Sequence, residues 1–344
     1  MNLIRKIKHF HSAFKKHVLV NVLEGNFSKP WHFVITNIKY RFLGYPYAAL
    51  IEVGNYCNLR CPTCPTPASK ICRKKELMSF DNFKKTIDNI KDSIQIALLY
   101  FTNEPLLHPD IFKMVKHAHK NNLYTEISTN AVLLNEEKTK ELLESGLDKI
   151  ILDLDGTSKE SYEQFRVGAQ FELVLGNIRH FCRQKQVLKL RKPFIELQFV
   201  LTKLNQNEVE DIKKIAKDLK VNNLCIRSFN LGEYAYSEKE IKELSGKFFP
   251  DSAKYQQKIR YERQGDKLKI KNPLLECPLA KSHFVVLVDG SVVMCCYDLR
   301  GEYVYGNVFS QKLKEIWFNR EVRKMRKIAQ KRGYPLCKTC SIYE

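Results

Sequence analysis

Apolar and polar positions alternate along residues 47–230 in a pattern typical of a repeated strand–helix unit. Short runs rich in β-branched and aromatic residues predict strands, and longer runs whose apolar residues recur every three or four positions predict helices. The predicted strands are Ala48–Val53, Ile96–Phe101, Tyr124–Ser128, Ile150–Leu154, Phe194–Leu201 and Asn223–Arg227; the predicted helices are Phe80–Ile90, Asp110–Lys120, Glu136–Ser145, Lys159–Arg183 and Glu208–Leu219. Strict alternation favours a parallel sheet with right-handed crossovers, so we expect an α/β fold.

The remaining segments have other patterns, and we divide the chain into regions 1–46, 47–235, 236–276 and 277–344. Near the N-terminus, apolar residues recur at a helical period with Lys and Arg between them, which predicts a basic amphipathic helix. This helix could pack on protein, or it could dock in a membrane interface through residues 1–24. Residues 236–276 are highly charged and predict a helical connector. An Asp289-Gly290 turn and five cysteines suggest a small C-terminal domain.

Composition narrows the class of protein. Eleven cysteines without a signal peptide favour a reducing cytoplasm and metal ligation over disulfides. No apolar run approaches the roughly 18 residues that span a bilayer. The formal charge of +20 suits nucleic acid, an anionic surface or acidic substrates. Because the lysines are spread along the chain and no nucleic-acid motif is present, we do not expect nucleic acid as a partner.

Cys57, Cys61 and Cys64 form a C-x3-C-x2-C run directly after the first predicted strand. Four-iron clusters normally take four thiolates, so three thiolates on one loop would leave one iron open to a small molecule. Zinc is the alternative, but zinc prefers four ligands, often in paired C-x2-C units, and this loop has no obvious fourth donor.

This run resembles the signature of the radical S-adenosylmethionine (SAM) enzymes, and the likeness covers residues 47–230 and 277–340. The resemblance implies a partial (βα)6 TIM-like barrel in which a [4Fe–4S] cluster on Cys57, Cys61 and Cys64 binds SAM through its open iron. Reductive cleavage of SAM to a 5′-deoxyadenosyl radical and hydrogen abstraction from a substrate would follow. Thr63 stands where the family usually has an aromatic residue, so we assign the adenine contact to Tyr56.

Residues at three later strand ends also match family motifs. Glu104 lies in a Thr-Asn-Glu-Pro run where the family usually has Gly-Gly-Glu-Pro, which implies a contact with the SAM amino group. Ser128 and Asn130 stand near the family's ribose and carboxylate contacts. Asp153 and Arg166 resemble a family stretch in which the arginine faces SAM. Arg166 could bind the SAM carboxylate, or it could form a structural pair with the neighbouring aspartates.

Cys277, Cys295, Cys296, Cys337 and Cys340 form a second cysteine group. The region resembles the SPASM auxiliary-cluster domain or its shortened twitch form. The simplest count is a second [4Fe–4S] cluster on Cys277, Cys295, Cys337 and Cys340, with Cys296 as a spare or a replacement for Cys295; zinc is again the alternative. A fully ligated cluster has no vacant iron, so we expect it to transfer electrons.

These features predict a cytoplasmic radical SAM enzyme with a small C-terminal auxiliary-cluster domain. We expect a flavodoxin- or ferredoxin-type electron donor and a peptide, sugar or other small molecule as substrate. Two alternatives stay open. One is a zinc-stabilised nucleic-acid-binding protein, and the other is a radical SAM enzyme that acts on a membrane-associated lipid or glycan precursor.

Overall fold

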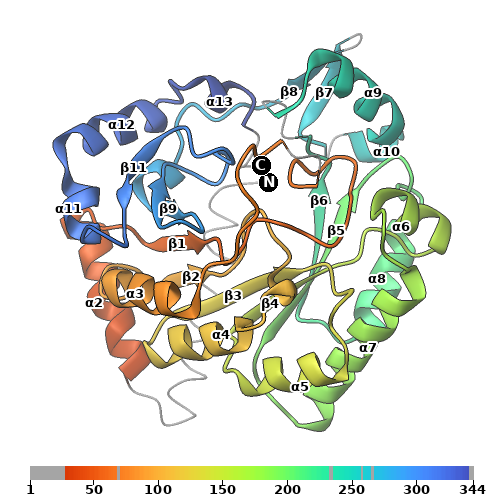
Figure 1. Ribbon diagram of the computed structural model, residues 1–344. Coiled ribbons are helices and arrows are strands. Elements are labelled where there is room, and N and C mark those ends of the chain that lie inside the picture. Colours follow the sequence, from red (N-terminus) through yellow and green to blue (C-terminus); the bar gives the residue numbers. More distant parts are fainter. Residues whose placement is uncertain (1–27, 68–69, 232–234, 257–258, 265–266, 341–344) are drawn as a thin grey trace.

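The computed structural model describes residues 28–67, 70–231, 235–256, 259–264 and 267–340. It confirms the predicted α/β class: a curved parallel sheet is surrounded by helices, as Figure 1 shows. The strands are β1 (Ala48–Ile51), β2 (Ile96–Leu98), β3 (Tyr124–Thr129), β4 (Lys149–Asp153), β5 (Phe194–Leu201) and β6 (Asn223–Ser228); the helices are α3 (Phe80–Ile90), α4 (Ile111–Lys120), α5 (Glu136–Glu144), α6 (Lys159–Phe165), α7 (Phe171–Val187) and α8 (Val209–Asp218). Neighbours β1 to β6 pair in chain order, as a partial (βα)6 barrel requires.

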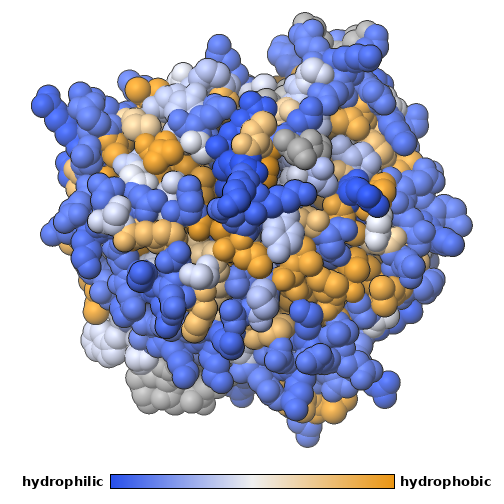
Figure 2. Space-filling view, in the orientation of Figure 1, coloured by the Kyte–Doolittle hydropathy of each residue, from blue (hydrophilic) through white to orange (hydrophobic). Residues whose placement is uncertain are grey.

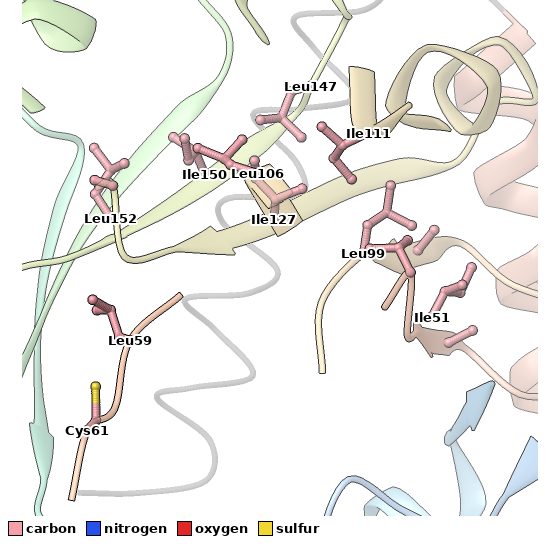
Figure 3. Close-up of a cluster of buried hydrophobic side chains, with 14 of the residues drawn as sticks. Ile51, Leu59, Cys61, Leu99, Leu106, Ile111, Ile127, Leu147, Ile150 and Leu152 are labelled. Carbon is pink, nitrogen blue, oxygen red and sulfur yellow. The ribbon is translucent and has the colours of Figure 1, made fainter. Parts of the chain in front are cut away.

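The two faces of the sheet differ in polarity because successive side chains of a strand point to opposite sides. On β3 and β4, Ile127, Ile150 and Leu152 are fully buried in the hydrophobic core. Figure 3 shows Leu106 and Ile111 in the same cluster. The alternate residues of β3 to β6 are mostly polar and face the inside of the barrel.

One predicted helix was wrong. Lys159–Arg183 was expected to be continuous, but the chain forms α6 and α7 with a break between them. Arg166 leaves the helical conformation at the end of α6, and Gly168 adopts a φ of +98°, which interrupts a helix. The periodic pattern continued across the break, so it did not reveal this turn.

The predicted helical connector was also only half right. Residues 236–276 contain α9 (Glu238–Phe248) and the short α10 (Ala253–Gln256), but an antiparallel hairpin follows, formed by β7 (Tyr261–Gln264) and β8 (Lys267–Ile270). Lys-Leu-Lys-Ile alternates polar and apolar residues as a strand does, but Tyr-Glu-Arg-Gln does not, and the high charge of the region favoured a helical interpretation.

The C-terminal region joins the sheet of the barrel. It contains β9 (His283–Val286), β10 (Ser291–Val293) and β11 (Val304–Asn307), followed by α11 (Leu313–Phe318), α12 (Arg320–Gln330) and α13 (Pro335–Lys338). Strand β9 pairs parallel with β1, so nine strands form one sheet in the order β11-β10-β9-β1-β2-β3-β4-β5-β6. The predicted Asp289-Gly290 turn connects β9 and β10, and Gly290 has a φ of +84°.

Helix α2 (Ser28–Leu43) precedes the barrel and closes the end at which the strands begin. Gln95, just before β2, donates a hydrogen bond to the carbonyl of Phe33 (3.2 Å), and Lys29 contacts the carbonyl of Leu123, just before β3 (3.4 Å). The amphipathic helix expected near the N-terminus, and with it the membrane contact through residues 1–24, lies outside the described residues.

The surface is polar over most of the face drawn in Figure 2, with a hydrophobic area below its centre. Of the helices that the structure describes, none has the length and apolar character needed to cross a membrane.

Candidate functional site

A cavity of about 180 Å³ lies at the C-terminal ends of the first four strands. It is lined by Cys57, Leu59, Cys61, Cys64, Thr66, Pro67, Tyr100, Phe101, Asn103, Glu104, Ser128, Asn130, Asp153 and Arg166. The structure thus brings together every residue expected to hold the first cluster or SAM, except Tyr56. Among the described residues, Tyr56 contributes no side chain to the lining; its carbonyl accepts a hydrogen bond from the Glu104 N–H (3.1 Å).

The loop that carries Cys57, Cys61 and Cys64, called the cysteine loop below, is anchored in the hydrophobic core between its first two cysteines. Leu59 is buried in the main core, and Figure 3 shows Leu59 and Cys61 on the same loop segment. The N–H of Leu59 points to the Cys57 sulfur (3.4 Å), and the N–H of Arg60 donates to the carbonyl of Val167 (2.8 Å). These contacts fix residues 57–60 of the loop against the core and against Val167.

The electrostatics of the thiols fit metal ligation. Burial raises the pKa of Cys57 to about 12 and raises the pKa of Cys61 and Cys64, while the Arg166 guanidinium opposes the rise at Cys61. Without metal, these thiols stay protonated at neutral pH. Iron binding would displace their protons, because metals bind the thiolate. A three-cysteine donor set around a cavity with room for a small molecule fits a cluster with one open iron.

Glu104 joins the ends of β2 and β3. Its carboxylate accepts hydrogen bonds from the Thr129 hydroxyl (2.7 Å) and from the N–H groups of Asn130 (2.9 Å) and Leu106 (3.0 Å). Burial raises the pKa of Glu104, and these three donors oppose the rise. Asn130 in turn donates to the Asn58 side chain (2.9 Å) and lies 3.7 Å from the Cys57 sulfur. Glu104 therefore positions part of the cavity wall as well as lining it.

Arg166 forms the aspartate pair that was one of its two predicted roles. It donates from Nε to Asp155 (2.6 Å), and its Nη2 lies 3.4 Å from an Asp153 oxygen. Its Nη1 is directed at the Cys61 sulfur (4.0 Å). The guanidinium thus neutralises buried carboxylates while one edge remains at the cavity. Burial raises the pKa of Asp153 to about 7, and Arg166 limits the rise.

A polar network covers the inner face of the barrel below this cavity. Tyr100, which lines the cavity, donates to Glu126 (2.7 Å). Lys149 lies between two carboxylates, 3.3 Å from Glu126 and 3.5 Å from Glu196. The side chain of Arg227 on β6 donates to Gln198 (3.0 Å), which donates to Asp153 (2.9 Å).

The sequence analysis did not single out Tyr100, Asn58, Thr129, Glu126 or Lys149 as site residues. Glu126 and Lys149 are directly paired in the β3–β4 register, so polar residues at alternate positions of neighbouring strands were the available signal. Ala131, directly after Asn130, has a φ of +58°, a left-handed backbone conformation that favours glycine.

The five C-terminal cysteines surround a second, smaller cavity of about 30 Å³. Its lining consists of Cys277, Cys295, Cys296, Cys337 and Cys340 with Leu274, Leu279, Ala280, Met294, Ala329, Arg332 and Leu336. Arg332 donates to the carbonyls of Cys337 (2.5 Å) and Cys340 (2.8 Å), which fixes the C-x2-C turn. Burial raises the pKa of Cys295, Cys296 and Cys337. A set of four or five thiols in an apolar pocket fits a fully ligated iron–sulfur cluster.

A small apolar cluster lies between the two cavities. Val285, Leu287 and Val293 of the C-terminal strands form its centre, and both Phe101 and Cys296 pack against it. Phe101 also lines the first cavity and Cys296 the second, so a short run of packed side chains separates the two sites.

Comparison with known proteins supports this arrangement. The family model of the radical SAM superfamily matches residues 51–214, and that of SPASM, an iron–sulfur cluster-binding domain, matches residues 277–341. The chain is 25% identical over 323 residues to the tungsten-containing aldehyde ferredoxin oxidoreductase cofactor-modifying protein of Pyrococcus furiosus, covering 85% of this chain and 86% of the relative. It is 33% identical over 116 residues to PqqA peptide cyclase of Bradyrhizobium diazoefficiens, covering 34% of this chain and 30% of that protein.

Two solved structures share the fold. SuiB of Streptococcus suis bound to the precursor peptide SuiA aligns with a TM-score of 0.62 at 13% identity, over 94% of this chain and 83% of SuiB. BtrN in complex with AdoMet and 2-DOIA aligns with a TM-score of 0.53 at 18% identity, over 86% of this chain and 93% of BtrN. The two domains imply [4Fe–4S] clusters and SAM as cofactors. Residues 51–214 therefore form a radical SAM superfamily domain, and residues 277–341 form a SPASM iron–sulfur cluster-binding domain.

Proposed function

We propose that this chain cleaves SAM reductively at the cysteine loop and uses the product to abstract hydrogen from a peptide or small-molecule substrate. When bound, the cluster and SAM would supply a 5′-deoxyadenosyl radical, with the electron coming from a flavodoxin- or ferredoxin-type donor. The observation that supports this function best is the single cavity shared by Cys57, Cys61 and Cys64 with Glu104 and Arg166.

Each polar residue has a role that follows from its contacts. Glu104 holds the β3 end through Thr129 and Asn130, and its carboxylate would attract the cationic amino group of SAM. Arg166, held by Asp155, would present its remaining N–H groups to the SAM carboxylate. Ser128 and Asn130 would contact the ribose or carboxylate, since hydroxyl and amide groups both donate and accept hydrogen bonds.

The substrate would lie between this cavity and the polar network of the barrel. Tyr100 lines the cavity and bonds to Glu126, and Lys149, Glu196 and Arg227 supply charges of both signs. Such a surface suits a polar substrate better than an apolar one, because buried charges need partners. A relative named as a peptide cyclase and one named as a cofactor-modifying protein support a peptide or a small cofactor.

The second cluster would serve as an electron carrier. Cys277, Cys295, Cys337 and Cys340 would complete its ligation and leave no iron open to substrate. The packing of Phe101 and Cys296 against one apolar cluster brings the two sites close together. An electron left on a substrate radical after deprotonation could therefore pass to this cluster, which would make the net reaction a two-electron oxidation.

The test is an anaerobic reconstitution with iron, sulfide and 5′-deoxyadenosine measured together. We expect about eight irons per chain and SAM cleavage with a strong reductant. Cys57→Ala should lose about four irons and all SAM cleavage. Cys277→Ala should also lose about four irons, but it should still cleave SAM when no substrate is present. Cys72→Ala is the matched control, because Cys72 is exposed on the same loop and outside the cavity.

Bound zinc in place of iron, with no SAM cleavage, would contradict the proposal and favour the zinc-stabilised nucleic-acid-binding alternative. About four irons with full cleavage would leave the radical chemistry intact and reject the second cluster.

A further inference from the structure

Helix α2 exposes apolar side chains and buries polar ones, which is the reverse of an ordinary surface helix. Six of the fifteen large apolar side chains exposed in the described residues lie on it. Its buried residues are instead polar, Lys29 and Thr36. Trp31, Val34, Ile35, Ile38 and Phe42 are exposed by 43–78%, and their spacing of three or four places them in one stripe, which we call the α2 stripe.

Polar contacts prevent α2 from turning this stripe inward. Lys29 bonds to His119 (2.9 Å) and pairs with the buried Asp148 (3.3 Å). His32 bonds to the carbonyl of Lys91 (2.8 Å). A roll of the helix would withdraw Lys29 from the buried Asp148 carboxylate and leave Lys192 (3.6 Å) as its lysine partner, which is unfavourable because buried charges need partners. The stripe is therefore presented outward by the fold.

Charge indicates what the stripe contacts. Lys39 and Arg41 flank it on opposite sides in helical projection, and α2 contains no Asp or Glu. The first 43 residues hold eight Lys or Arg and a single acidic residue, Glu24. A second copy of this chain, with its own +20 charge, would be repelled, whereas an anionic surface would be attracted. Apolar and aromatic residues bordered by cations are typical of helices that lie in a membrane interface.

We propose that the α2 stripe docks the protein on the surface of an anionic membrane. A helix of 16 residues, about 24 Å long, would lie in the headgroup region, with Trp31 and Phe42 entering the acyl boundary and Arg41 at the lipid phosphates. The ammonium of Lys39 also donates to the carbonyl of Asp92 (2.7 Å), so Lys39 would add its positive charge from beside the helix. Figure 1 places α2 at the outer edge of the molecule beside α3.

Docking by α2 would leave the cysteine cavity free. Contacts of α2 with Gln95, Leu123 and Asp148 place it at the ends where β2, β3 and β4 begin, while the cavity lies at the opposite ends. A substrate would thus reach the cavity from the aqueous side. The proposal does not depend on the chemistry at that site, so it can fail or succeed separately.

The experiment uses the full chain with phosphatidylcholine vesicles that contain or lack phosphatidylglycerol. The protein has two tryptophans: Trp31 is 68% exposed and Trp317 is fully buried, so fluorescence changes report mainly on Trp31. We expect flotation with anionic vesicles, a blue shift of the emission, and little binding to neutral vesicles. Ile35→Ser, Ile38→Ser and Phe42→Ser combined should weaken binding about tenfold or more while retaining Trp31.

The control variant carries Val187→Ser and Leu188→Ser, which remove similarly exposed apolar side chains at the end of α7. It should bind like the wild type, and unchanged melting temperatures would show that both variants fold. Wild-type protein that fails to float, or a stripe variant that still floats, overturns the proposal. So does loss of binding only on deletion of residues 1–27, or a stripe variant that changes the sedimentation mass without changing vesicle binding.

Discussion

Glu104 holds the end of β3 through hydrogen bonds to Thr129 and Asn130, and we expect its charge to contribute to SAM binding. Replacing it with Gln removes the charge and turns one acceptor into a donor that faces N–H and O–H donors. Hydrogen bonds to a charged group contribute about 1.5–3 kcal/mol each, so we expect Glu104→Gln to weaken SAM binding at least tenfold. Iron content should not change, since Glu104 is not a ligand. Equilibrium dialysis of SAM against reconstituted protein measures this, with the exposed Glu141→Gln on α5 as control; equal affinities in both variants would contradict it.

His283, at the start of β9, should make the free energy of unfolding depend on pH. Burial lowers the pKa of His283 to about 4, whereas an unfolded histidine has a pKa of about 6.5. Between these values the unfolded chain binds more protons, so the free energy of unfolding should fall as the pH drops from about 6.5 to 4, by about 2–3 kcal/mol in total. His283→Gln should flatten this dependence. Melting temperatures of both proteins at pH 7.5 and pH 5 test it, and parallel decreases would refute the assignment.

At the scale of elements, replacing each of two glycines with alanine should change the free energy of unfolding in opposite directions. A Cβ on Gly156, after β4, would lie 2.6 Å from the Ser161 hydroxyl and 2.8 Å from the Tyr162 nitrogen, so Gly156→Ala must displace the start of α6 and should cost about 1–3 kcal/mol. Gly176 lies in α7, and no atom outside the neighbouring backbone of its own helix lies within 4 Å of that position, so Gly176→Ala should stabilise by about 0.5–1 kcal/mol. Urea unfolding distinguishes the two, and a loss of stability in both would show that α7 does not tolerate the added methyl group.

The elements also show where local patterns succeed. Helix α3 has the predicted bounds, because an apolar stripe coincides with an N-cap: the Ser79 side chain accepts a hydrogen bond from the N–H of Asn82 (3.2 Å). The α6–α7 break was missed because Arg166 leaves its helix to reach Asp155, a contact made by a side chain and invisible to periodicity. The β7–β8 hairpin was missed because β8 alternates polar and apolar residues but β7 does not, so the pair of strands has only half of the expected pattern.

For the whole molecule, a buried ion pair links the cysteine loop to the C-terminal strands. Arg73 donates two hydrogen bonds to the fully buried Glu52 (2.6 Å each) and a third to the carbonyl of Leu299 (3.0 Å). Glu52 also accepts from the N–H of Val288 (3.1 Å) and from the Thr102 hydroxyl. The pair therefore joins the end of β1, the loop between β1 and α3, and the C-terminal strands β9 to β11.

Arg73→Met would leave the Glu52 carboxylate buried without its partner, which costs about 3–5 kcal/mol in comparable pairs. We expect a lower melting temperature and faster loss of iron from reconstituted protein. Arg60→Met, on an exposed arginine of the same loop, serves as control, and adding Glu52→Gln to Arg73→Met should recover part of the loss. Equal melting temperatures for the Arg60 and Arg73 variants would show that the pair does not stabilise the assembly.

The sequence by itself determined the six barrel strands, their alternation with helices and the two cysteine groups. Periodicity and cysteine spacing are local properties, so the sequence without coordinates predicts that Cys57, Cys61 and Cys64 share one metal site. The tertiary structure decided how distant residues meet: β9 beside β1, Glu104 against Thr129 and Asn130, and the outward stripe of α2. Those contacts depend on how whole elements pack, and burial of Lys29 with Asp148 orients α2 more strongly than the hydrophobic pattern of the helix itself.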